Sequence, residues 1–554
     1  MLNDDHASPT RVDALVVGAG FSGVAMLYRL RKLGLSSLVL ESAADFGGVW
    51  YWNRYPGARV DSEWPYYQLN IPEVYHNWNF SERFPGHKEI RTYFKHLDEV
   101  LGLRKDVVFN AHVYDCRWIE ADGEWEVKAR MQTGDWQGQS EATSEPDKVV
   151  RCKYLVLCTG LLHRRHYPDF PGLETYKGVL HHTGFWPEAT STKGKRVGIV
   201  GAGATAVQVV QEVAKDAEHL TCFFRRPSMC LPMKQRNLSS AEQNEWMSYF
   251  PTLFSQGRLS QAGFPGARPT TKMKEEESAA RETRWERGIS RGGFSFLQSN
   301  YMDVVLDKET NKEVYAYWAK KTRSRLTDSR KADLLAPLGD KQPYYIGTKR
   351  LPLEQDYYEC MDQPNVDIVD LGSNPFKSFN KKGIELSDGT QLNLDIIVLA
   401  TGFDSFSGSI TSMGLKNKDG LDIKDYWADG IKSYLGMTIH GFPNAFMCYT
   451  PHAPTALSNG PTIIEAQTDF IAAAISGMQT KKIKTLQPSS QAQEEWQALI
   501  NMMNEHTLFP LTNSWWSGGN IPGKKVQMLT YPGGIQASDL YKLLHSAHTI
   551  SKQV

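Results

Sequence analysis

The sequence predicts an α/β protein that contains two copies of one strand–turn–helix–strand unit, with the second copy inserted in the chain of the first. Three observations support this fold class. Short apolar runs at residues 14–17 and 197–200 each lead into a glycine-rich turn and a helix with an apolar face. Two further apolar runs, at 154–160 and 395–403, mark the places where the chain passes between the copies. With 554 residues, the chain can hold more than one domain.

In the first copy, three glycines follow the strand at G-x-G-x-x-G spacing. The first permits a tight turn, the second lets a pyrophosphate approach the backbone, and the third lets the helix pack on the strand. The helix N-terminus offers free N–H groups to phosphates. Glu41 ends the next strand, where it can accept hydrogen bonds from a ribose diol. We therefore predict a Rossmann-like dinucleotide site formed by Gly18, Gly20, Phe21, Gly23 and Glu41.

The second copy repeats this pattern but ends differently. Its predicted turn and helix start consist of Gly201, Gly203, Ala204, Thr205, Ala206 and Gln208. The strand that follows ends in Arg225 and Arg226, where the first copy has an acid. Guanidinium groups attract a 2′-phosphate, which a carboxylate would repel. We therefore predict that the second site binds NADPH and that the first, acid-terminated site binds FAD.

Composition narrows the possible partners and location. Sixty-two basic and sixty-two acidic residues give no net formal charge, which argues against nucleic acid or an anionic membrane surface as a partner. The seven cysteines are scattered and form no C-x-x-C motif, which favours a reducing compartment over a disulfide framework. No apolar run approaches the roughly 20 residues that span a bilayer. We expect a cytoplasmic protein without a metal, either a monomer or a weak homo-oligomer.

The region from about residue 233 to 335 has a different character from its surroundings, because its charge-rich segments favour helices. We expect a mostly helical insertion in the second domain, with its charges on solvated faces. The predicted organisation is a flexible arm at 1–11, the first part of the FAD domain at 12–160, a linker at 161–195, the NADPH domain at 196–390, and the rest of the FAD domain with a C-terminal segment over the active site at 391–554.

The stretch 174–187, ETYKGVLHHTGFWP, shows neither helical nor strand periodicity. Its adjacent histidines do not suit a metal site, since neighbouring side chains seldom bind one ion together. Its pattern is similar to the linker fingerprint of type I Baeyer–Villiger monooxygenases, with Tyr176 in place of Phe. The matching residues are Gly178, His182, Trp186 and Pro187. The segments GGVWYWNRYPGARVD, GTKRLPL, ATGFD, PTALSNG and SWWSGGNIPGKK extend the resemblance over nearly the whole chain.

The resemblance implies a reaction and a catalytic pair. FAD and NADPH would insert one oxygen atom of O₂ beside a ketone carbonyl, through a peroxide on the flavin C4a carbon, to give an ester or lactone. Sulfoxidation is an expected second activity. Arg350 matches the family's catalytic arginine, and Asp61 matches the carboxylate that holds it. A permanently protonated, fork-shaped donor suits the negative charge of such a reaction. A small ketone and O₂ are therefore the expected partners.

The resemblance also adds candidate contacts. For FAD they are Val49, Trp50, Asp61, Tyr67, Val113 and Gly460, and for NADPH they are Lys349, Arg350 and Trp515. Leu457 is a predicted wall of the substrate pocket. Gly460 stands where relatives often carry a bulkier side chain, which predicts a roomier pocket. We expect His182 and Trp186 to fix the linker between domains rather than to react.

Other flavoenzymes share parts of this pattern. A flavin-containing N- or S-monooxygenase has both nucleotide folds but lacks the pair of Arg350 and Asp61. An NADPH oxidase that releases hydrogen peroxide could carry every motif, and both alternatives stay open. A disulfide reductase needs a redox cysteine pair near the first turn, and no cysteine precedes Cys116. Intact catalytic residues argue against a non-catalytic flavoprotein.

Overall fold

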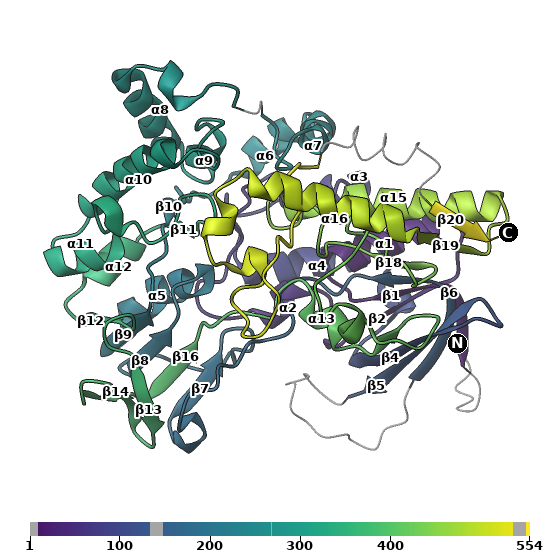
Figure 1. Ribbon diagram of the computed structural model, residues 1–554, viewed down its shortest axis with the longest axis horizontal. Helices are drawn as coiled ribbons and strands as arrows, with labels where there is room; N and C mark the ends of the chain where they lie inside the picture. Colours follow the sequence, from purple (N-terminus) through teal and green to yellow (C-terminus); the bar gives the residue numbers. More distant parts are fainter. Residues whose placement is uncertain (1–8, 133–147, 267–268, 536–549, 554) are drawn as a thin grey trace.

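A computed structural model describes residues 9–132, 148–266, 269–535 and 550–553 of the chain (Figure 1). Two separate sheets organise the molecule, and each contains one of the two predicted strands in its interior. The predicted fold class, two Rossmann-like domains with the second inserted in the first, is confirmed. No helix in the described part of the chain is long and apolar enough to cross a membrane.

The first sheet is built around β1 (Thr10–Val17), which is buried on both faces. Leu15 and Val16 point into different core clusters, as expected for a parallel strand covered on both sides. The strand order is β17-β4-β5-β6-β1-β2-β3, and β18 also pairs with β6. The other strands are β2 (Ser37–Leu40), β3 (Val107–Val108), β4 (Ala111–Ile119), β5 (Glu124–Met131), β6 (Lys148–Leu157), β17 (Leu415–Lys416) and β18 (Ala445–Met447).

The second sheet has five parallel strands in the order β12-β9-β8-β16-β7. They are β7 (Val179–His182), β8 (Arg196–Val200), β9 (His219–Phe224), β12 (Val366–Asp370) and β16 (Ile396–Leu399). The presence of β7 corrects the expectation of an irregular linker. Its burial does not alternate, because Val179 and Leu180 are both exposed at the sheet edge. The strand forms because β16 supplies a paired backbone, which a local pattern cannot reveal.

Three small sheets lie outside the two large ones. They are β10 (Leu231–Pro232) with β11 (Leu353–Glu354), β13 (Phe376–Asn380) with β14 (Gly383–Leu386) and β15 (Gln391–Asn393), and β19 (Thr485–Pro488) with β20 (Ile550–Gln553). In the domain of the first large sheet, helix α1 (Phe21–Lys32) packs against the long helix α15 (Gly460–Thr480). The remaining helices outside the insertion are α2 (Val49–Trp52), α3 (Pro72–Tyr75), α4 (His87–Leu101), α5 (Ala204–Asp216), α12 (Tyr357–Asp362), α13 (Gly408–Thr411), α14 (Ile423–Tyr426) and α16 (Ser490–Glu505).

The predicted insertion is helical, but its helices divide between two cores. They are α6 (Ser240–Met247), α7 (Phe250–Leu259), α8 (Ser278–Arg291), α9 (Ser295–Gln298), α10 (Lys308–Arg323) and α11 (Ser329–Leu335). Phe250 and Phe254 of α7 pack into the core of the first sheet, whereas Trp285 and Trp318 pack into the core of the second. Figure 1 shows α6 and α7 apart from the group formed by α8 to α11. The insertion therefore bridges both domains.

Some predicted boundaries shift at the ends of the chain. Residues 1–8 of the predicted arm lie outside the described residues, whereas Thr10 and Arg11 already belong to β1. They extend the strand because Thr10 pairs with Val150 of β6, a partner distant in sequence. Of the predicted C-terminal part, residues 536–549 and 554 also lie outside the described residues.

Candidate active site

A cavity of about 1070 Å³ lies between the two large sheets, and both glycine turns open on it. Most of the site residues predicted from the sequence line this cavity. They are Gly18, Gly20, Phe21, Glu41, Val49, Trp50, Asp61, Tyr67, Val113, Ala204, Thr205, Gln208, Lys349, Arg350, Leu457, Gly460 and Trp515. The structure thus brings together residues from both copies and from the C-terminal segment. Six other predicted residues flank the site without lining the cavity: Gly23, Gly201, Gly203, Ala206, Arg225 and Arg226.

The first turn has the geometry of a dinucleotide site. Gly18 has φ +104°, and a Cβ there would lie 2.5 Å from the carbonyl oxygen of Cys158, so no other residue fits. A Cβ on Gly23 would lie 1.8 Å from the oxygen of Gly18, which shows how closely α1 packs on β1. The N-terminus of α1 has no side-chain cap, so its N–H groups remain available to phosphate. This cradle fits the pyrophosphate of FAD.

Glu41 stands at the end of β2, as predicted. Its side chain is 4% exposed, and its two oxygens accept the backbone N–H groups of Ala19 and Ala43 at 2.6 and 2.7 Å. Burial raises the pKa of Glu41, against these hydrogen bonds, which lower it. An ionised carboxylate has about four acceptor positions, so acceptor capacity remains for a ribose diol.

The second turn repeats this geometry, with Gly201 at φ +123° and an uncapped N-terminus of α5. Three cations gather beyond it. Arg225 and Arg226 follow β9, and both act on Lys349, whose pKa is lowered by burial and by these two charges. In the described part of the chain, no carboxylate forms an ion pair with any of the three. A cluster of unpaired cations fits the 2′-phosphate of NADPH.

Gln208 has a structural role that the sequence did not predict. Its amide oxygen accepts the Tyr55 hydroxyl at 2.9 Å, and its nitrogen donates to the carbonyl oxygen of Arg59 at 2.9 Å. The side chain therefore joins α5 of the second domain to a loop of the first. It lines the cavity, but its polar atoms are occupied by the protein.

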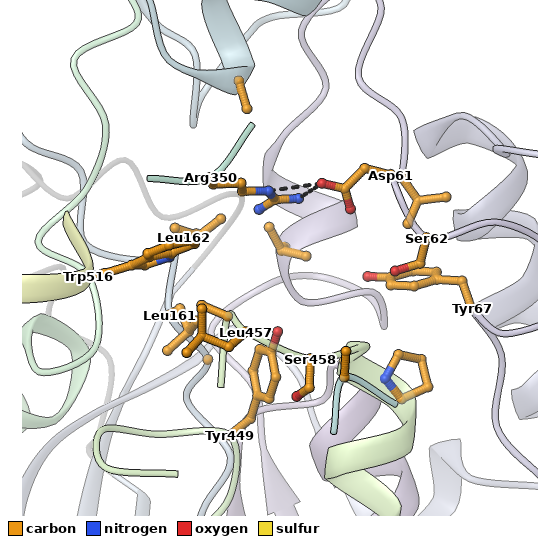
Figure 2. Close-up of a pocket in the computed structure, with 18 of the residues that line it drawn as sticks. Asp61, Ser62, Tyr67, Leu161, Leu162, Arg350, Tyr449, Leu457, Ser458 and Trp516 are labelled. Carbon is orange, nitrogen blue, oxygen red and sulfur yellow. Dashed lines mark hydrogen bonds and ion pairs between the residues drawn. The ribbon is translucent and has the colours of Figure 1, made fainter. Parts of the chain in front are cut away.

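Arg350 and Asp61 form an ion pair inside the cavity (Figure 2). The Nε atom of Arg350 donates to Oδ2 of Asp61 at 2.9 Å, and Nη2 donates to the same oxygen. Burial opposes the charge of Arg350, but Asp61 outweighs it and raises the pKa of the guanidinium. The arginine is therefore a fixed cation, and its other N–H groups can bind an anion.

Aromatic and apolar side chains line the space around this pair. The Trp50 indole N–H donates to the Tyr67 hydroxyl at 2.9 Å, and burial raises the pKa of Tyr67. An apolar wall lies opposite Tyr67 and consists of Leu161, Leu162, Leu457 and Trp516 (Figure 2). Trp515 also lines the cavity, and its ring stacks on Phe406 with centroids 5.5 Å apart.

Several lining residues were not predicted. Leu161 and Leu162 follow the Thr-Gly turn after β6, Trp516 adjoins the predicted Trp515, and Tyr449 lies just before the PTALSNG motif. Their closeness to recognised motifs was the only available signal in the sequence. No periodicity distinguishes a pocket side chain from a core side chain at the end of a strand.

The two histidines of the linker bind different partners. His181 Nε2 lies 2.8 Å from the Thr190 hydroxyl, whereas His182 Nε2 lies 3.0 Å from the carbonyl oxygen of Gly402. His182 Nδ1 accepts the Gly184 N–H, so the ring is a neutral Nε2–H tautomer. Burial lowers the pKa of His182 to about 4. Its neutral ring packs edge-on against Phe403, which lines the cavity.

The other fingerprint residues also make structural contacts. Trp186 is buried and contacts His181, and Pro187 is exposed. A Cβ on Gly178 would lie 2.1 Å from the Tyr176 hydroxyl, which donates to the Leu394 carbonyl oxygen. None of the four fingerprint residues lines the cavity.

The chain is similar to flavin-dependent monooxygenases over nearly all of its length. A flavin-binding monooxygenase-like family model matches residues 11–236. The FAD-binding monooxygenase acrE of Aspergillus aculeatus is 40% identical, with coverage of 95% of this chain and 86% of that protein. Cyclopentanone 1,2-monooxygenase of Comamonas sp. is 37% identical, with coverage of 95% and 92%. The NADP⁺-bound structure of cyclohexanone monooxygenase from Rhodococcus sp. Phi1 superposes with a TM-score of 0.92 at 30% identity, with coverage of 99% and 100%.

Two dinucleotide turns that share one cavity with a paired arginine define a flavin- and nicotinamide-dependent oxidoreductase. Together with the extent of these matches, this places the chain in the family of Baeyer–Villiger monooxygenases. It uses FAD, NADPH and O₂ to insert one oxygen atom beside a ketone carbonyl. The family, activity and cofactors predicted from the sequence are thereby confirmed.

Proposed function

We propose that Arg350 and Asp61 are the catalytic pair of this monooxygenase and that its substrates are compact ketones, which become esters or lactones. The ion pair inside the cavity shared by both glycine turns carries this proposal. When bound, FAD would take two electrons from NADPH and activate O₂, so that one oxygen atom enters the substrate and the other leaves as water. Arg350 provides a permanent positive charge where negative charge develops on the carbonyl oxygen of the substrate. Asp61 fixes the orientation of the guanidinium before the reaction begins.

The cofactor sites follow from the two turns. We assign FAD to the turn of Gly18 to Gly23 with Glu41, and NADPH to the turn of Gly201 to Ala206 with Arg225, Arg226 and Lys349. Trp50 and Tyr67 would contact FAD, and Trp515 would contact NADPH. The domains predicted from the sequence are residues 12–160 with 391–554 for FAD and 196–390 for NADPH, joined by a linker at 161–195. Because β7 and β16 pair in the sheet of β8, we place the NADPH domain at about 179–399, the FAD domain at 12–160 with about 400–554, and the linker at about 161–178.

The substrate class is supported by the relatives and by the cavity. Relatives with 37% and 30% identity are named for cyclopentanone and cyclohexanone. In this chain, Leu161, Leu162 and Leu457 offer an apolar wall of the kind that holds a hydrocarbon ring. Sulfoxidation of small thioethers is a proposed second activity, since the same wall accepts an apolar ring whether it carries a carbonyl or a sulfur.

Substitution of Arg350 tests the proposed pair. Arg350→Ala should continue to oxidise NADPH but form hydrogen peroxide instead of ester, with ester formation lowered about 10²- to 10³-fold. Arg350→Lys keeps a charge but loses the fork, so it should recover only a small part. Asp61→Asn should give an intermediate loss, because the guanidinium keeps its charge but loses its fixed position. Normal ester formation by Arg350→Ala would contradict the assignment.

We also propose that the enzyme is cytoplasmic and is a monomer or a weak homo-oligomer. All seven cysteines are free and buried, which supports a reducing compartment. Burial also raises the pKa of several of these thiols, including Cys152 and Cys222, so they remain protonated. Light scattering after size-exclusion chromatography would test the proposed oligomeric state.

A further inference from the structure

Tyr449 enters the cavity from an unusual backbone position. It follows β18 with φ +60°, in the left-handed region that bulky residues rarely adopt. Such a conformation costs on the order of 1 kcal/mol or more and persists only where surrounding contacts enforce it. Here the Tyr449 N–H donates to the side-chain oxygen of Gln467 at 2.8 Å, which fixes the peptide. The strained backbone directs a phenol ring into the cavity rather than into the core.

The hydroxyl of this ring faces open space beside the catalytic pair. Figure 2 shows it pointing between Leu457 and Tyr67, below Arg350 and Asp61. In the described part of the chain, its hydrogen has no acceptor. By contrast, Ser458 on the same wall donates its hydroxyl to the Pro454 carbonyl oxygen at 2.6 Å. Tyr449 therefore offers a donor that the protein itself does not use.

The surroundings keep this donor protonated. Burial raises the pKa of Tyr449 to about 12, against Arg350 and the Ala456 backbone, which lower it, while Asp61 adds to the rise. The phenol is consequently neutral at any pH at which the enzyme is expected to work. A neutral hydroxyl can donate one hydrogen bond to an oxygen in the cavity.

We propose that the Tyr449 hydroxyl donates a hydrogen bond to the carbonyl oxygen of the ketone and so positions it beside Arg350. The proposal rests on the proposed ketone substrate and adds a second donor to the one that Arg350 provides. The ring of the substrate would lie on the wall of Leu161 and Leu457, with its carbonyl turned toward Tyr449. Two donors from separate elements define the direction of a carbonyl better than a single one.

This arrangement makes a prediction that separates ketones from sulfides. A ketone and a thioether of the same shape fill the same apolar wall, but only the ketone carries an oxygen that accepts the phenol hydrogen. Cyclopentanone and tetrahydrothiophene are such a pair, both five-membered rings. A donor to the carbonyl oxygen should matter for the first compound and not for the second.

The test compares Tyr449→Phe with the unmodified holoenzyme on both compounds. Phenylalanine keeps the ring and removes only the hydroxyl, and Tyr154→Phe removes a buried phenol hydroxyl outside the cavity as the matched control. We expect kcat/KM for lactone formation to fall about 10- to 100-fold in Tyr449→Phe only. Sulfoxide formation, FAD content, flavin absorbance and melting temperature should not change.

Any other outcome would contradict the proposed role of the Tyr449 hydroxyl or the proposed substrate class. An equal loss for ketone and sulfide, or no loss for either, would show that the hydroxyl does not bind the carbonyl oxygen. Altered FAD content or flavin absorbance in Tyr449→Phe would assign the hydroxyl to the cofactor instead. If the unmodified enzyme forms no lactone or ester from any ketone in a panel of ring sizes, the proposed substrate class itself is wrong, and the proposal for Tyr449 falls with it.

Discussion

The hydroxyl oxygen of Tyr449 lies 3.5 Å from the position that a Cβ atom on Gly460 would occupy. The phenol therefore occupies space beside Gly460, and the pocket there is not as roomy as the glycine alone predicts. The two residues are complementary: the absence of a side chain at the start of α15 leaves room for a large ring from the segment after β18. A bulky residue at 460 would compete for the same volume.

Gly460→Met should therefore displace the Tyr449 ring and lower ketone turnover. Overpacking of this kind costs about 1–3 kcal/mol. Gly460→Ala is the control, because its Cβ would make only ordinary van der Waals contact with the ring. Kinetics on cyclic ketones of increasing size would measure the effect. Urea unfolding tests the shared space: if Gly460→Met were as destabilising in a Tyr449→Ala background as in the unmodified protein, the two side chains would not share this space.

The sequence predicted the two glycine turns well, because each is a pattern of consecutive residues with one geometry. The proposed catalytic pair was accessible only through the family resemblance, since Arg350 and Asp61 are 289 residues apart. The packing of Tyr449 beside Gly460 could not be predicted for a related reason. It depends on the positive φ at Tyr449, which no residue pattern around that position indicates.

Lys349, Arg225 and Arg226 should determine the preference for NADPH. Replacing Lys349 and Arg225 together by Ala should raise the KM for NADPH roughly 10²- to 10⁴-fold, since each charged hydrogen bond contributes about 1.5–3 kcal/mol and every 1.4 kcal/mol is a factor of about ten. The KM for NADH should change little, because NADH has no 2′-phosphate. Steady-state kinetics with both nucleotides measures the effect, and Arg226→Ala alone gives the share of that residue. An equal rise for both nucleotides would mean that the cations do not bind the phosphate.

His182 should matter for stability, and His181 much less. His182→Ala leaves the buried Gly184 N–H without its partner, which costs about 1–3 kcal/mol. It also removes one of two donors to the Gly402 carbonyl oxygen, which keeps the His166 N–H. His181→Ala is the neighbouring control, since that ring is half-buried and its Nε2 bonds to the Thr190 hydroxyl. Urea unfolding of both variants measures the difference. Equal midpoints would contradict a specific role of His182 in joining β7 to the loop after β16.

The linker also shows where local patterns stop being informative. The sequence placed His182 in a connector on the strength of a fingerprint, and the structure gives it a buried, neutral and fully bonded ring. The strand that carries it has an exposed start and a buried end, so it lacks the alternation by which strands are recognised. Only the pairing with β16 explains it.

Glu465 on α15 should make stability depend on pH. Its side chain is 4% exposed, and burial raises its pKa to about 7, against Arg29 and Arg258, which lower it. The unfolded chain releases this proton near pH 4.5, so the folded state binds more protons between about pH 4.5 and 7. Stability is therefore lost as pH rises through this window.

Glu465→Gln should remove this loss, because a neutral amide can still accept the Asn70 N–H at the same position. We expect the variant to match the unmodified protein at about pH 4.5 and to exceed its stability at about pH 8, by about 1.4 kcal/mol for each unit of the pKa difference. Urea unfolding at both pH values measures this, with the exposed Glu505→Gln as control. A variant that is less stable than the unmodified protein by the same amount at both pH values would show that the Glu465 carboxylate is ionised in the folded protein throughout.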